Sequence, residues 1–425
     1  MEYILNFFST KSNDPIINLL LHEYQNGALA QYVNGIVMTK PVGFIHMLHR
    51  QQNLWREHSF ESFTYVVSRT ICDIVTRLEH RCAAEQVEIL YKLARKTNSK
   101  KWVKDISKAV ANIVLARYER DVETGNIQPI TFDSLAGFIP ISGISVINFR
   151  TGEVIRRRPE HYFTYEVHVE YNREAILDSV YNPNSNSASR ELVNQYMATL
   201  MSEDTLPIQD RVKVNYLQKV LGYALTGECS EHKMFIFIGE TGENGKSVFI
   251  RILYNSFPKL MHSGQTSMIC HYRAKGANPE VDELRGSRAI FMSEIGRDNK
   301  LSDFAFQQLT GGELIRSHKM REKDNFWIPT FTMFLQTSSL PQRSTDRLTL
   351  ERLVLIPFTA RFVANPTQPH ERQQNRDTDQ LSQNAEFRRE LFAWLVEGAR
   401  KYYQEGLQAP PEVLQKTSEY TGLPL

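Results

Sequence analysis

The sequence has few cysteines, no long hydrophobic run and almost no net charge. Its four cysteines are too few and too scattered for a disulfide framework or a paired-ligand zinc site. No segment reaches the roughly 18 consecutive apolar residues of a membrane span, and the amino terminus lacks the pattern of a secretory signal. The formal net charge of the 425 residues is +2, so a nucleic-acid site must be a local concentration of charge. We expect a cytoplasmic or nuclear protein that has no membrane partner.

The amino-terminal 130 residues have a helical pattern. The stretches FTYVVSRTICDIVTRL and DISKAVANIVLARY repeat apolar residues at three- and four-residue intervals. Between them, KLARKTNSKKWVK carries six basic residues, no acidic residue and Trp102. It is interpreted either as a nucleic-acid contact in which Trp102 stacks on bases or as a solvated helix end with Trp102 half buried. The second interpretation is favoured, because runs of charge usually face solvent.

The pattern then changes to β-forming residues. Alternation around a turn at Thr151 and Gly152 indicates a hairpin followed by another strand. The Asn- and Ser-rich stretch at 181–190 is the best linker candidate. After it, RVKVNYLQKVLGYALTG predicts a helix that ends at Gly227. A second polar stretch, ANPTQPHERQQNRDTDQLSQNAEF, precedes a closing helix at FRRELFAWLVEGARKYYQEG.

The stretch MFIFIGETGENGKSVFIRIL indicates a strand, a glycine turn and a helix. In this context backbone N–H groups of the turn and of the helix N-terminus converge on phosphate oxygens. Lys246 is expected to reach the β and γ phosphates of ATP, and the Ser247 hydroxyl to coordinate Mg²⁺. The strict phosphate-loop pattern G-x-x-x-x-G-K-S/T requires glycine at position 240, where the chain has Glu240; its glycine, Gly239, comes one place early. This mismatch lies at the start of the loop rather than at the residues expected to bind phosphate. The expected nucleotide-binding residues are Gly242, Glu243, Asn244, Gly245, Lys246 and Ser247.

A second apolar strand in SRAIFMSEIGRD ends in an acidic residue, Glu294. We expect Glu294 to polarise the attacking water, as a general base or an orienting group, and to serve the metal together with Ser247. Ser293 stands where a second acid is usual. The alternative is that Glu294 is only a loop residue.

Further motifs follow in a fixed order, and the series as a whole resembles a known family. The matching segments are Asn244 to Ser247, Ser293-Glu294, Leu309 to Gly312, Pro329-Thr330-Phe331, Thr337 to Pro341, and Arg352 with Ile356-Pro357-Phe358. The series is similar to that of the superfamily 3 helicases, in the poxvirus-type and phage-primase-associated branch found in large DNA viruses, phages and plasmids. The resemblance covers about residues 140–420.

The resemblance implies an α/β fold with a P-loop AAA+ ATPase core at 191–362. A mainly helical, collar-type region with a β-hairpin would occupy 1–190, and a small helical lid 363–425. The implied activity is that of a replicative DNA helicase in a virus-infected cell, an ATP hydrolase that moves along single-stranded DNA, 3′ to 5′, and unwinds the duplex. Single-stranded and forked DNA, a homo-hexameric ring and a primase domain or protein are the implied partners. The chain is expected to be one part of a longer protein or a shorter relative.

The same resemblance implies roles for residues outside the phosphate site. Arg352 would act in trans as an arginine finger on ATP bound between subunits; the alternative is an ion pair with Glu351 or another acid. Ser338 replaces the asparagine that the family uses as a polar sensor, and its hydroxyl offers fewer contacts. In the hairpin IRSHKMREKDNFW three basic residues recur at every second position, so on a strand they share one face and could line a DNA channel. These residues are Lys319, Arg321 and Lys323.

Three other functions stay open. A different P-loop enzyme, such as a nucleotide kinase, would need acceptor-binding residues but neither the basic hairpin nor Arg352 in trans. A packaging or remodelling ATPase would hydrolyse ATP in a ring without separating strands. A non-catalytic DNA-binding ring would tolerate Ser338 and show no turnover.

Overall fold

The computed structural model divides the chain into two compact units. Unit 1 comprises Met1–Thr131 and Arg158–Thr164, and unit 2 comprises Phe132–Arg157 and Tyr165–Leu425. The structure describes the whole chain except residues 1–3, 5–11, 26–35, 39–43, 50–51, 127–129, 170–187, 240–241, 271–278, 297–298, 318–324 and 425. The functional division after residues 190 and 362 stays a prediction.

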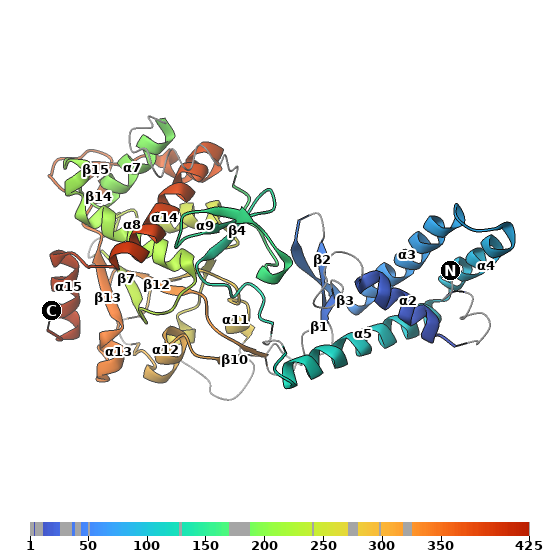
Figure 1. Cartoon of the computed structure of the whole chain (residues 1–425). Helices are drawn as coiled ribbons and strands as arrows, with labels where there is room; N and C mark the ends of the chain where they lie inside the picture. The colour runs from blue at the N-terminus through green and yellow to red at the C-terminus, as the bar shows by residue number, and fades with distance from the viewer. Residues whose placement is uncertain are drawn as a thin grey trace. The chain divides into compact units, whose positions relative to one another are not determined.

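Unit 1 combines packed helices with a three-stranded antiparallel sheet (Figure 1). Its core includes the buried side chains of Phe63, Leu90 and Ile106. The ring of Trp102 packs half buried against this core, and its Nε1 donates to Asn13 Oδ1 over 2.9 Å. The predicted helices are confirmed, whereas the sheet was not predicted. The elements are α2 (Asp14–Gln25), β1 (Ile36–Met38), β2 (Phe44–His49), β3 (Leu54–Ser59), α3 (Phe60–Glu79), α4 (Ala84–Lys96), α5 (Lys100–Glu123) and η2 (Pro159–His161).

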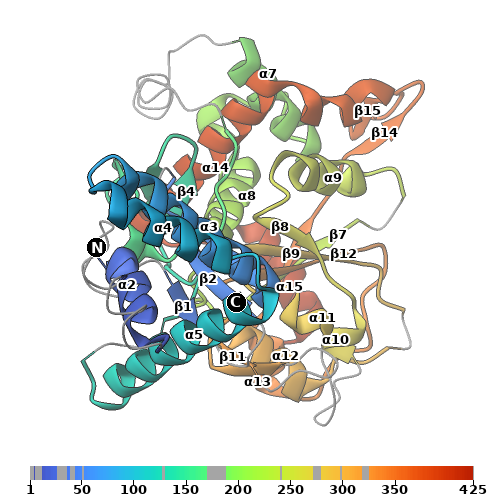
Figure 2. The same ribbon diagram turned by 90° about the vertical axis from the view of Figure 1, so that its right-hand side faces the viewer.

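The centre of unit 2 is a five-stranded parallel sheet with the order β13-β7-β12-β9-β8 (Figure 2). Numbered along the chain, these strands have the order 5-1-4-3-2. Because they are parallel, the segments that follow β7, β9 and β12 all leave from one edge, where ligands of α/β proteins bind. The strands are β7 (Met234–Ile238), β8 (Met261–Ser263), β9 (Ala289–Ser293), β12 (Thr332–Thr337) and β13 (Leu353–Pro357).

Both faces of this sheet are covered, which explains why its strands are continuously apolar. Phe235 and Phe237 point into a core shared with helices α8, α9 and α14. The alternate residues Met234 and Ile236 point into a second core, to which α12 contributes Phe306. An α/β fold with a parallel sheet is therefore confirmed.

Helices α8 and α14 lie side by side on the first face (Figures 1 and 2). Their backbones approach so closely that a Cβ on Gly222 would lie 2.1 Å from Ala399 N, and one on Gly398 2.1 Å from Gln218 O. The predicted end of α8 is confirmed, since Gly227 adopts φ +74° there. Within the described residues, no helix combines the length and hydrophobicity that crossing a membrane requires.

A small antiparallel sheet, β4-β5-β6, corrects one prediction. The hairpin around Thr151 and Gly152 joins β5 to β6, as predicted. Its third strand, however, precedes the hairpin, and the described residues between Arg156 and residue 170 contribute only an isolated bridge between Ile141 and Val167. The alternation of residues there indicated β structure, but Tyr162 with φ +51° interrupts the extended backbone.

The remaining elements of unit 2 surround these two sheets. They are β4 (Phe138–Ile141), β5 (Ser145–Asn148), β6 (Val154–Arg156), α7 (Ala188–Leu200), η3 (Ile208–Asp210), α8 (Val212–Thr226), α9 (Lys246–Ser256), α10 (Ser267–Cys270), α11 (Pro279–Asp282), α12 (Asp303–Thr310), β10 (Ile315–Ser317), β11 (Asn325–Trp327), α13 (Arg347–Glu351), β14 (Arg361–Val363), β15 (Glu371–Gln373), η4 (Arg376–Gln383), α14 (Ala385–Glu405) and α15 (Pro411–Thr421). Helix α7 begins inside the predicted linker, whose residues 181–187 lie outside the described part of the chain.

Candidate nucleotide-binding site

The phosphate loop, residues 239–245, connects buried strand β7 to helix α9. Gly245 starts the helix with φ +77°, and a Cβ there would lie 2.9 Å from Phe362 Cε2. Glycine is therefore favoured here both by the positive φ and by the lack of space for a side chain beside Phe362. The described part of the loop and the first turn of α9 leave Gly242, Glu243 and Ser247 exposed. Residues 240–241, including the mismatched Glu240, lie outside the described residues.

The side chain of Lys246 folds back over this loop. It is 7% exposed, and its Nζ donates to Asn244 Oδ1 over 2.5 Å. A Cβ on Gly239 would lie 2.4 Å from Lys246 Nζ, so the early glycine makes room for the lysine. Burial lowers the pKa of Lys246 to about 8, and the negative charge of Glu294 acts in the opposite direction. An ammonium group held over a glycine loop is suited to bind phosphate oxygens.

Glu294 and Ser338 meet at the same edge of the sheet. Glu294 Oε2 lies 3.2 Å from Thr337 Oγ1, 3.4 Å from Ser338 Oγ and 3.5 Å from the backbone N of Ser338. Glu294 has φ +46°, an uncommon conformation for this residue type that is frequent at functional sites. The register sets Thr337 opposite Ile238, the last residue of β7, so both side chains lie beside the phosphate loop. Thr337, which the sequence analysis named as part of a matching segment but gave no role, thus joins the predicted pair.

The arrangement offers oxygen ligands for a metal. Mg²⁺ that is bound through a nucleotide needs only one or two protein oxygens, because phosphates and water complete its octahedron. The exposed Ser247 hydroxyl and Glu294 carboxylate are such ligands, so the predicted metal residues fit the ion. Among the described residues, no three His, Cys, Asp or Glu side chains cluster as a separate metal site.

Arg352 lies at the opposite edge of the sheet. It precedes Leu353, which is paired with Met234 at the beginning of β7, so the length of β7 separates Arg352 from its own phosphate loop. That length is about 16 Å for five residues. Arg352 Nη1 donates to Gln307 O and Thr310 Oγ1, each over 2.8 Å, at the end of α12. Arg352 therefore cannot serve the site of its own chain, and a role in a neighbouring site stays a prediction.

The alternative ion pair of Arg352 with Glu351 is not formed. Glu351 instead pairs with Arg347, whose Nε lies 2.7 Å from Glu351 Oε1. The basic hairpin is defined at its base, where β10 and β11 pair in antiparallel register. Lys319, Arg321 and Lys323 lie outside the described residues, so their predicted contact with DNA stays a prediction.

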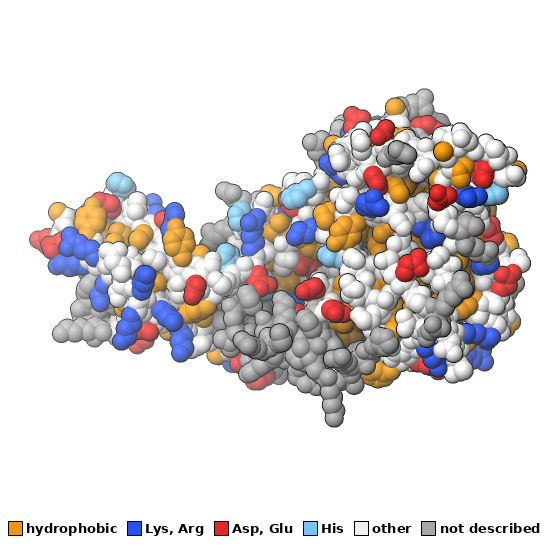
Figure 3. All heavy atoms as spheres, turned by 180° about the vertical axis from the view of Figure 1, so that it is seen from behind, with side chains coloured by type: hydrophobic (Ala, Val, Ile, Leu, Met, Phe, Trp, Pro, Cys, Tyr) orange, Lys and Arg blue, Asp and Glu red, His pale blue; other side chains and the backbone are white. Residues whose placement is uncertain are grey.

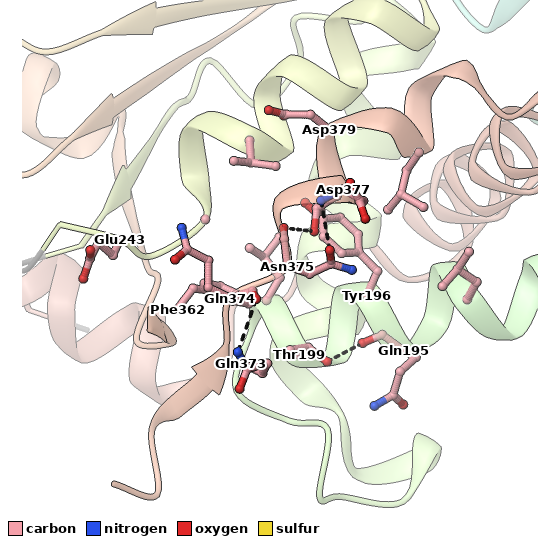
Figure 4. A pocket seen from close by; sticks show the side chains of 16 residues that line it. Gln195, Tyr196, Thr199, Glu243, Phe362, Gln373, Gln374, Asn375, Asp377 and Asp379 are labelled. Carbon is pink, nitrogen blue, oxygen red and sulfur yellow. Dashed lines mark hydrogen bonds between the residues drawn. The ribbon is translucent and has the colours of Figure 1, made fainter. Parts of the chain in front are cut away.

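A cavity of about 580 Å³ adjoins the phosphate loop (Figure 4). Helix α7 provides Tyr196, while the segment after β15 provides Asn375, Asp377 and Asp379. Two oxygens of the lining residues, Tyr196 Oη and Asp379 Oδ1, have no accessible surface and no hydrogen-bond partner among the described residues. The other oxygen of Asp379 pairs with Arg251 over 2.6 Å. Sequence analysis missed these residues, although the polar stretch after residue 362 was a signal for part of them.

Comparison with known proteins identifies viral relatives. Putative helicase L207/L206 of Acanthamoeba polyphaga mimivirus is 25% identical over 222 residues, which are 50% of this chain and 23% of that protein. Putative helicase 184R of Invertebrate iridescent virus 6 is 24% identical over 326 residues, 73% of this chain and 31% of that protein. Putative helicase 121R of Invertebrate iridescent virus 3 is 27% identical over 209 residues, 45% of this chain and 22% of that protein. The chain is similar to viral proteins named as helicases.

These similarities cover only parts of the relatives. The matched regions amount to 23%, 22% and 31% of their lengths, so the chain spans less than a third of each. No protein-family model matches the chain. Solved structures of the NrS-1 C-terminal region give TM-scores of 0.37 and 0.40, with 16% and 12% identity over 54% and 72% of this chain and 51% and 64% of those chains. The assignment of an α/β fold therefore rests on the strands described above.

Proposed function

We propose that the chain is the motor of a ring-forming, ATP-dependent DNA helicase of the superfamily 3 type. The observation that carries the proposal is the convergence of Lys246, Glu294 and Ser338 at one edge of three adjacent parallel strands. Strand β12 ends in polar residues and lies between β7, which precedes the phosphate loop, and β9, which precedes Glu294. This order supports an AAA+-type core. Similarity to helicase-named proteins of large DNA viruses supports the same activity.

In this mechanism each side chain has a defined task, and Glu294 has two. Lys246 leaves Asn244 and binds the β and γ phosphates, while backbone N–H groups at the start of α9 bind the remaining oxygens. Glu294 orients a water for attack on the γ phosphate, and Ser338 holds the carboxylate of Glu294 in place. Ser247 and Glu294 would hold Mg²⁺, which would supply positive charge beside the phosphates. Arg352 of a neighbouring subunit stabilises the charge that develops on the transferred phosphoryl group.

The cavity beside the loop would hold the nucleoside part of ATP. Its exposed polar side chains, Asn375 and Asp377 among them, are placed to contact a bound nucleoside.

ATP hydrolysis by the whole chain, with and without single-stranded DNA, tests the proposal. If the chain is a helicase, it hydrolyses ATP, single-stranded DNA stimulates this hydrolysis, and Lys246→Ala abolishes it. Absence of turnover in the wild type would favour a non-catalytic ring. Turnover that DNA does not change would favour a different P-loop enzyme.

A further inference from the structure

A stripe of lysines runs along the beginning of helix α5 in unit 1. Lys100, Lys104 and Lys108 recur every four residues, so they follow one face of the helix over about 12 Å. All three are exposed. None of them forms an ion pair with a described carboxylate, and that includes the neighbouring Asp105. The stripe thus presents uncompensated positive charge to solvent.

Helix electrostatics do not explain Lys100, the first lysine of the stripe. The N-terminus of a helix carries partial positive charge, which favours acidic side chains and disfavours cations. The first turn of α5 has no acidic residue and begins with Lys100 and Lys101. By contrast, Arg95 and Lys96 lie in the last turn of α4, where cations are favoured. A position that breaks a local rule without compensation is a candidate functional position.

The stripe belongs to a wider concentration of charge. Residues 92–108 include seven basic residues and a single acid, although the whole chain has a net charge of only +2. Figure 3 shows Lys and Arg side chains gathered on the helical part of this unit. Such a local concentration is the electrostatic mark of a surface that binds a polyanion.

We propose that this stripe of α5 binds the phosphate backbone of duplex DNA. Duplex DNA carries one charge per roughly 1.7 Å of axis, so about seven phosphates lie within the roughly 12 Å of the stripe. Single-stranded DNA is the less suitable ligand, because its binding surfaces stack bases on exposed aromatic rings. Trp102 does not offer such a ring: it is half buried, its Nε1 is bonded to Asn13, and Lys96 Nζ lies 5.7 Å from its centroid. The proposal goes beyond the proposed helicase activity and takes from it only the choice of DNA as the polyanion.

The test is the salt dependence of duplex binding by the full chain. The plot of log K against log[salt] has a negative slope, and each lost phosphate contact makes it shallower by about 0.9. K100Q/K104Q should therefore make the slope shallower by about 1.8. Glutamine keeps the helix propensity of lysine, and removing the charge of Lys100 from the first turn should leave the melting temperature unchanged or raise it. K100R/K104R should keep the wild-type slope.

A matched control lies at the other end of α4. Arg77 and Arg81 are exposed cations beside the beginning of α4, and the 13 residues of α4 put them about 20 Å from the stripe. R77Q/R81Q changes the net charge equally and should leave the slope unchanged. An unchanged slope for K100Q/K104Q, or an equal loss in the control, would overturn the proposal. So would an equal loss of affinity for single-stranded DNA.

ATP hydrolysis measured on the same preparations tests the proposed function separately. Absence of turnover in the wild type would refute the helicase, whereas the change in slope would still report a duplex-binding surface. The two proposals therefore fail on different readouts.

Discussion

Burial of Lys246 links nucleotide binding to pH. Its pKa is lowered to about 8 before nucleotide binds, and phosphate beside the ammonium group would raise it again. Nucleotide binding should then take up a proton near and above pH 8, and affinity should fall by up to about tenfold per pH unit above that value. Titration calorimetry with ADP in the absence of Mg²⁺, in buffers of different ionisation enthalpy, measures both effects.

An arginine at this position serves as the control. Arginine stays charged throughout the accessible pH range. Lys246→Arg should therefore bind ADP with an affinity that does not change between pH 7 and pH 9, whatever its absolute value. A wild-type affinity that is equally independent of pH would contradict the role of Lys246 as the buried phosphate ligand.

The contact of α8 with α14 depends on two glycines. A Cβ on Gly398 would lie 2.1 Å from the backbone oxygen of Gln218, and backbone cannot move aside as a side chain can. Gly398→Ala should lower the free energy of unfolding by about 3 kcal/mol, at the upper end of the cost of overpacking. Denaturant titration measures the change. Gln404→Ala, at an exposed position of α14, should change it by less than about 0.5 kcal/mol.

Elements with a strong local pattern could be predicted from the sequence. The apolar run before the glycine turn gave strand β7 and helix α9, and a single glycine marked the end of α8. Glu294 was named because it follows an apolar strand, whereas Ser338 was named through the resemblance alone. Glu294 and Ser338 meet because β9 and β12 are parallel neighbours, so the residues that follow both strands lie at the same edge of the sheet. The order of the motifs along the chain does not show this pairing, and only the resemblance indicated it.

Features built from distant segments could not be predicted. The cavity wall joins Tyr196 of α7 to Asp379, which lies far along the chain, and no local pattern connects the two. The sheet β1-β2-β3 was missed because its short strands lie among residues read as helical. The third strand of the β4-β5-β6 sheet was assigned to the wrong side of the hairpin, because pairing order is a long-range property.

At the level of the whole molecule, the separation of Arg352 from its own phosphate loop requires a partner subunit for the proposed finger. Mixing Arg352→Ala with Lys246→Ala subunits should restore part of the ATPase activity, because some interfaces then combine an intact lysine with an intact arginine. The measurement is turnover against mixing ratio, with mixed rings verified by mass. Absence of rescue at every ratio would contradict a finger in trans. It would instead assign Arg352 to capping the end of α12.

Strand separation is the activity that distinguishes a helicase from the other ring ATPases. The decisive measurement is unwinding of a forked DNA duplex by the full chain with ATP and Mg²⁺, alongside the Lys246→Ala variant. We predict that the wild type separates the strands in an ATP-dependent reaction and that the variant binds the fork without opening it. Unwinding that persists in the variant, or ATP hydrolysis on the fork without strand separation, would contradict the proposed function.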